Sequence, residues 1–87
     1  MNTAVNELYD FGTVLKRKLS NNNLYAHYLS NAMKRGNRFD FLYYFLTATA
    51  DSGTPIPEHI STVFLMVLSD KTKFSDLTPF IMGMVGK

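Results

Sequence analysis

The side chains best suited to acid–base or metal chemistry in this chain are its two histidines, His27 and His59. His59 directly follows Glu58, and adjacent residues of a helix point in different directions, so the two side chains do not converge on one group. The chain has no cysteine and no His-Glu-x-x-His sequence, in which two histidines one helical turn apart hold zinc. We therefore expect no catalytic site, no metal site and no cofactor, and we expect that the protein is not an enzyme.

Basic side chains are concentrated in the first half of the chain. Residues 1–38 carry six cations against two carboxylates, whereas residues 39–87 carry three cations against five carboxylates. The six cations are Lys16, Arg17, Lys18, Lys34, Arg35 and Arg38. If a hairpin of the first two helices brings them together, they form a patch that binds the phosphates of nucleic acid.

Two observations count against this nucleic-acid alternative. Lys16, Arg17 and Lys18 are consecutive, so they fan around a helix and cannot all face one phosphate backbone. Cations in the last turn of a helix are also explained by their favourable interaction with the helix dipole. Nucleic-acid binding is therefore kept as the alternative to protein binding.

The densest apolar segment is residues 39–46, Phe-Asp-Phe-Leu-Tyr-Tyr-Phe-Leu. We expect a helix here, at the centre of the fold, with Phe41, Leu42, Phe45 and Leu46 on its buried side. Tyr43 and Tyr44 then project to the other side.

Leu65 and Met66 likewise point away from the main apolar stripe of the following helix. Tyrosine combines a large apolar area with a polar tip and is enriched at protein interfaces. We therefore predict a partner-binding surface that includes Tyr43, Tyr44, Leu65 and Met66, for a protein partner or for a second copy in a homodimer. The alternative is that neighbouring helices bury these two helices on all sides.

Apolar residues recur every three or four positions, which predicts helices over residues 3–19, 23–35, 38–50, 56–69 and 75–85. The expected inward residues of the first two are Ala4, Leu8, Phe11, Leu15 and Leu19, then Leu24, Tyr25, Tyr28, Leu29 and Ala32. Those of the last two are Ile60, Val63, Phe64 and Val67, then Leu77, Phe80, Ile81 and Met84.

Turn residues predict where these helices begin and end. Asn21, Asn22 and Asn23 break the first helix and offer a cap to the second, and Gly36 is expected to end the second in a left-handed conformation. Asn37 is the expected cap of the third helix, and Pro55 and Pro57 are expected at the start of the fourth, where the first helical turn tolerates missing amide donors. For the fifth, Ser75 is the expected cap, Pro79 fits only near the helix start, and Gly83 and Gly86 are expected to fray its end.

The fold predicted from these elements is an all-α, compact bundle of four to five short helices forming a single domain over residues 1–87. Residues 62–68 form a continuous apolar run that a buried strand would also produce, but the flanking sequence lacks hairpin turns and favours a helix. No segment approaches the ~20 apolar residues of a spanning helix. We therefore expect no membrane span.

The N-terminal residues lack both a basic start and an apolar run, so we expect no signal peptide and a cytoplasmic protein. Small size, absent chemistry and surplus aromatic surface predict a non-enzymatic, protein-binding accessory or regulatory module. Phages and mobile elements commonly encode such modules as modulators of host proteins. A homo-oligomeric structural component is a further alternative.

Overall fold

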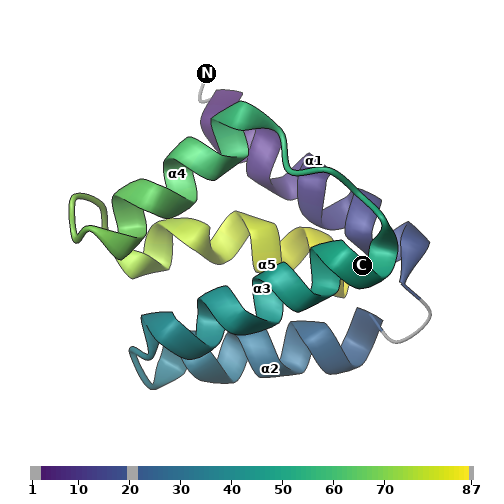
Figure 1. Cartoon of the computed structure of the whole chain (residues 1–87), viewed down its shortest axis with the longest axis horizontal. Coiled ribbons are helices and arrows are strands. Elements are labelled where there is room, and N and C mark those ends of the chain that lie inside the picture. Colours follow the sequence, from purple (N-terminus) through teal and green to yellow (C-terminus); the bar gives the residue numbers. More distant parts are fainter. Residues whose placement is uncertain (1–2, 20–21, 87) are drawn as a thin grey trace.

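The described part of the chain is helical, as Figure 1 shows. The structure is a computed structural model that describes residues 3–19 and 22–86, with side chains for residues 7–19 and 24–86. In these residues the α-helices are α1 (Thr3–Lys18), α2 (Asn22–Lys34), α3 (Arg38–Ser52), α4 (Glu58–Leu68) and α5 (Thr78–Val85), and a 3-10 helix, η1 (Phe74–Leu77), directly precedes α5. The same residues contain no strand, so the predicted all-α fold is confirmed. The alternative strand at residues 62–68 is wrong, because these residues lie in α4.

Three of the helices end with the same backbone motif. Gly36 after α2, Gly53 after α3 and Asp70 after α4 have φ angles of 69°, 66° and 65°. In each case the amide of the following residue donates a hydrogen bond to a carbonyl five residues earlier. The predicted left-handed stop at Gly36 is therefore confirmed, and Asp70 adopts the same conformation although it carries a side chain.

The starts of the helices agree with the sequence at two positions and differ at a third. The Oδ1 atom of Asn37 accepts a hydrogen bond of 3.0 Å from the amide of Asp40, which confirms the predicted cap of α3. Pro79 lies in the first turn of α5, where its missing amide costs nothing. The predicted cap at Ser75 is wrong, because residues 74–77 form η1 and the helix proper begins after Leu77. The cap predicted from Asn21, Asn22 and Asn23 lies outside the described residues or side chains.

The hydrophobic core is organised around the ring of Phe80. Helix α1 packs against α5, and α2 packs along α3. Four other rings lie at centroid distances of 5.5–6.5 Å from that of Phe80: Phe11 of α1, Phe41 and Phe45 of α3, and Phe64 of α4. Phe80 is completely buried. The centre of the core is thus supplied by α5, and only one face of the predicted central segment 39–46 takes part in it.

Several side chains expected to face inward are exposed. Leu24 and Tyr28 of α2 are exposed, and Ala26 is buried in their place. Leu46 of α3 is exposed as well, because α3 is covered by its neighbours on a narrower face than its all-round apolar sequence indicates. The predicted inward residues of α1, α4 and α5 are buried, apart from the half-buried Val63, while Ala4 lies outside the described side chains. Gly83 is also buried within α5 and does not fray its end, which corrects that expectation.

Candidate functional site

The outer face of α3 carries a stripe of exposed apolar side chains. Phe39 is 82% exposed and Tyr43 is 62% exposed, and Leu46 is exposed beside them. Residues three and four positions apart lie next to one another on a helix, so Leu42, which is half-buried, continues this stripe towards α4. A soluble helix usually turns such a stripe towards a core. Here it remains uncovered.

One flank of α4 adds two more exposed leucines. Leu65 is 64% exposed, and Leu68, one turn further along, is exposed as well. Leu68 and Leu42 line the same hollow between α4 and α3, which joins the two apolar stripes. We call the combined set of residues the α3–α4 surface: Phe39, Leu42, Tyr43, Leu46, Leu65 and Leu68.

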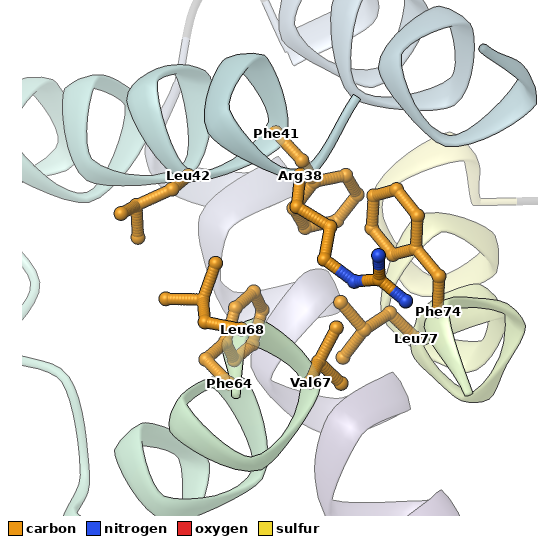
Figure 2. A pocket seen from close by; sticks show the side chains of 8 residues that line it. All are labelled: Arg38, Phe41, Leu42, Phe64, Val67, Leu68, Phe74 and Leu77. Carbon is orange, nitrogen blue, oxygen red and sulfur yellow. The ribbon is translucent and has the colours of Figure 1, made fainter. Parts of the chain in front are cut away.

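The hollow between Leu42 and Leu68 is apolar and small. Figure 2 shows Leu42 from α3 and Leu68 from α4 on its two sides, with Phe64 and Val67 of α4 beneath. Its volume is about 10 Å³, which is room for a group the size of one methyl group or one water molecule. A partner can therefore place the tip of one apolar side chain here.

Arg38 lies at the other end of this hollow, beside Phe74. Its guanidinium carbon lies 5.3 Å from the centroid of the Phe74 ring, and its Nη2 atom donates to Oδ1 of Asp70 at 3.0 Å. The Nε atom of Arg38 is buried and has no hydrogen-bond partner among the described residues. Asp70 itself is largely exposed, so this ion pair is screened by solvent and contributes little to stability.

The four residues predicted to bind a partner lie on different sides of the molecule. Tyr43 and Leu65 belong to the α3–α4 surface, and both are exposed. Met66 is exposed, but it is adjacent to Leu65 and two positions before Leu68, so it lies on another flank of α4. Tyr44 is half-buried, because its ring stacks on that of Tyr28 at a centroid distance of 4.7 Å.

Tyr44 faces a polar hollow between α2 and α3. The residues that line it are Tyr28, Asn31, Ala32, Arg35, Asp40 and Tyr44. Arg38 and Leu42, which line the hollow beside α4, lie on a different side of α3 from Asp40 and Tyr44. The two sides of α3 therefore offer an apolar surface and a polar one.

The six basic residues of the first half do not form one patch. Arg17 and Lys18 are exposed at the end of α1, whereas Lys34 and Arg35 are exposed at the end of α2. Helix α2 has 13 residues and is therefore ~20 Å long, so its last turn lies far from the α1 end, as Figure 1 shows. The side chain of Lys16 lies against Gly86, and Arg38 is paired with Asp70. The predicted gathering of these residues across a helical hairpin is not observed.

The histidines stand in simple surface contacts. Nε2 of His27 is 3.1 Å from Nδ2 of Asn31, and Nε2 of His59 is 3.7 Å from Oε1 of Glu7, which lies on α1. No group of three or more His, Cys, Asp or Glu residues that could hold a metal ion occurs among the residues that the structure describes.

The pKa of Tyr25 is shifted by its contact with another helix. Its hydroxyl donates a hydrogen bond to Oδ2 of Asp51, which links α2 to the last turn of α3. This hydrogen bond, partial burial and the negative charge of Asp51 raise the pKa of Tyr25 to about 12. This hydrogen bond holds α2 and α3 together.

Most of the α3–α4 surface was not predicted from the sequence. Leu42 and Leu46 were expected on the buried side of α3, and Phe39 and Leu68 were not among the predicted binding residues. A signal was available, because residues 39, 42, 43 and 46 follow the spacing of one helical face. This signal was weak in a helix whose positions 41, 42, 45 and 46 are all apolar, since periodicity then gives no unique inner face.

Comparisons of the chain with protein-family models, with curated proteins and with solved structures found no match. Among the described helices, none combines the length and the apolar character that crossing a membrane requires.

Proposed function

We propose that this protein is a small, non-enzymatic binding module that acts by contact with another protein through its α3–α4 surface. This proposal keeps the class of function predicted from the sequence, an accessory or regulatory protein such as a phage or mobile element directs at a host protein. It moves the binding residues from the predicted set to the surface defined above. Tyr43 and Leu65 belong to both sets.

The observation that carries the proposal is the joining of exposed apolar side chains from two helices around one hollow. From the exposed fractions of Phe39, Tyr43, Leu46, Leu65 and Leu68, the area is on the order of 500 Å². Single exposed apolar residues are normal, but patches near the upper end of a few hundred Å² commonly mark interaction sites. Protein interfaces are also enriched in aromatic side chains, and this surface includes Phe39 and Tyr43.

The proposal is tested by comparing what wild-type and variant proteins retain from a lysate of the native host. The double variant Phe39→Ser/Leu65→Ser removes apolar area from both helices. Met82→Ser on α5 is the matched control, because Met82 is also exposed but lies outside the α3–α4 surface. We expect a protein that wild type and Met82→Ser retain and that the double variant loses.

Circular dichroism separates loss of binding from loss of fold. Because both substituted side chains are exposed, the helical signal and the melting temperature of the double variant should match those of wild type. Equal retention by the double variant and the wild type would contradict the proposal.

The nucleic-acid alternative has its own test. Binding through Lys and Arg contacts to phosphates predicts a mobility shift with DNA or RNA that weakens steeply between low and moderate salt. Because the structure places the basic residues at separate ends of α2, we expect no shift, even at low salt. A salt-sensitive shift that is lost in the double variant Lys34→Glu/Arg35→Glu would favour the alternative.

A further inference from the structure

A second hollow adjoins the apolar one at the turn that follows α4. It is lined by Arg38, Asp70, Lys71, Thr72, Lys73, Phe74 and Ser75. Arg38 and Phe74 line both hollows, so the two hollows are adjacent. An elongated ligand that lies between α3 and α4 and passes Leu42 and Leu68 therefore meets this second hollow next.

The second hollow is basic. Its lining has three cations and one carboxylate, and that carboxylate, Asp70, is already paired with Arg38. Lys71 and Lys73 are exposed and form no ion pair with a described residue. Asp76, the other carboxylate of this segment, does not line the hollow. Two unpaired ammonium groups thus stand at the end of an apolar surface.

The carboxylates of the same two helices lie away from the basic hollow. Asp40 lines the polar hollow beside α2, Asp51 accepts a hydrogen bond from Tyr25 of α2, and Glu58 lies in the first turn of α4. None of these three lines the basic hollow, so the carboxylates of a bound segment are attracted to Lys71 and Lys73 there.

A second copy of the chain and a lipid surface fit these features less well. In a two-fold dimer centred near the two hollows, the basic end of one copy meets the same lysines of the other, and like charges in an interface are costly. A bilayer engages protruding side chains such as Phe39, but it leaves unfilled the hollow between Leu42 and Leu68, which lies between two helices. Hollows of this kind accept single side chains from a peptide.

We propose that the α3–α4 surface binds an acidic amphipathic segment of a partner protein. The apolar side chains of the segment contact Phe39, Leu42 and Leu68, and its carboxylates contact Lys71 and Lys73. This inference rests on the proposed function, because it names the class of partner that the same surface takes.

The test is a selection from a random peptide library displayed on phage, with the intact protein as bait. Wild type is compared with two variants of equal charge change, Lys71→Glu/Lys73→Glu at the basic hollow and Lys34→Glu/Arg35→Glu at the end of α2. All four substituted side chains are exposed. We expect wild type and the α2 variant to enrich the same peptides, rich in Asp and Glu and with apolar residues three or four positions apart.

Binding of one enriched peptide is then measured by fluorescence anisotropy. Because two favourable charge contacts become two repulsive ones, Lys71→Glu/Lys73→Glu should weaken binding by about tenfold or more. The same peptide should bind Lys34→Glu/Arg35→Glu within about twofold of wild type, and added salt should weaken the wild-type complex.

The outcomes separate this inference from the proposed function. The double variant Phe39→Ser/Leu65→Ser is measured with the same peptides. Enriched peptides that bind wild type, lose binding to this double variant and carry no excess of acidic residues overturn the inference and keep the proposed function. If no enriched peptide loses binding to Phe39→Ser/Leu65→Ser, both the inference and the proposed function are overturned. Sedimentation at several concentrations and binding to vesicles of anionic lipid complete the comparison, because a dimer or a vesicle complex abolished by Phe39→Ser would assign the surface to those occupants instead.

Discussion

Gly12 of α1 and Gly83 of α5 face each other where these two helices cross. A Cβ atom on Gly12 would overlap the carbonyl oxygen of Phe80, and one on Gly83 would overlap the carbonyl oxygen of Tyr9. Both obstacles are backbone atoms of the opposite helix, which cannot turn aside as a flexible side chain can. The close contact of α1 with α5, and with it the position of Phe80 in the core, therefore depends on two residues without side chains.

Substituting either glycine with alanine should destabilise the protein. Alanine favours a helix by up to about 1 kcal/mol over glycine. Forcing two packed helices apart costs about 3 kcal/mol, so we expect a net loss of about 2 kcal/mol in the free energy of unfolding. The measurement is chemical denaturation of Gly12→Ala and of Gly83→Ala. Gly53→Ala is the control, because Gly53 has a positive φ with open space around it and should cost only about 1 kcal/mol. If Gly12→Ala and Gly83→Ala lower the free energy of unfolding no more than Gly53→Ala does, the close contact between α1 and α5 would be contradicted.

The hydrogen bond between Tyr25 and Asp51 should make stability depend on alkaline pH. The pKa of Tyr25 is about 12 in the folded protein and 10.0 without these contacts. Between these pH values the unfolded chain has lost the Tyr25 proton while the folded chain keeps it. The contribution of Tyr25 to the free energy of unfolding is therefore fully present below pH 10 and is lost as the pH rises towards 12.

The measurement is the melting temperature across this range for wild type and Tyr25→Phe. We expect the alkaline decline to be smaller in Tyr25→Phe, while Tyr9→Phe, at an exposed tyrosine without this hydrogen bond, should behave as wild type. An alkaline decline that is the same in all three proteins would show that Tyr25 does not hold its proton more tightly in the folded state.

Asp70 should be replaceable by glycine but not by alanine. Its φ of 65° is unfavourable for residues with a Cβ atom, although Asp and Asn tolerate it better than others. Its ion pair with Arg38 is exposed and is worth at most about 1 kcal/mol. We expect Asp70→Gly and Asp70→Asn to stay within about 1 kcal/mol of wild type and Asp70→Ala to lose about 1–2 kcal/mol more than Asp70→Gly. Thermal denaturation of the three variants decides this, and an alanine variant as stable as the glycine variant would argue against the left-handed conformation.

Tyr44 and Tyr43 should respond differently to alanine although they are neighbours. Tyr44 stacks on Tyr28 between α2 and α3, and we expect a double-mutant cycle of Tyr28→Ala and Tyr44→Ala to give a coupling of about 1 kcal/mol. Tyr43 is exposed, so Tyr43→Ala should change stability by less than about 0.5 kcal/mol. Partner capture should show the reverse pattern, with Tyr43→Ala affecting it more than Tyr44→Ala. A coupling free energy of zero would contradict this prediction, because it would mean that the contact between the two rings does not stabilise the fold.

Local features were readable in the sequence because they depend on neighbours along the chain. The spacing of Leu8, Phe11 and Leu15 predicted α1 and its buried stripe, and Gly36 and Asn37 marked the turn between α2 and α3 through a left-handed φ and a side-chain cap. Exposure of Tyr43 and Leu65 was also predicted, since each lies away from its helix's main apolar stripe.

The arrangement of the helices was decided by contacts between residues far apart in the chain. The residues around Gly83 in the sequence do not show whether this glycine lets another helix approach or frays a helix end. Its role is visible only in the structure, where the backbone of α1 lies against it. In the same way, α3 is apolar on most of its surface, and only the positions of the other helices select which side of it is covered. The sequence alone therefore determined the helices, the cap at Asn37 and the left-handed stop at Gly36. The tertiary structure decided that Phe39, Leu42 and Leu46 remain available beside Leu68, because α3 has more apolar faces than its neighbours cover.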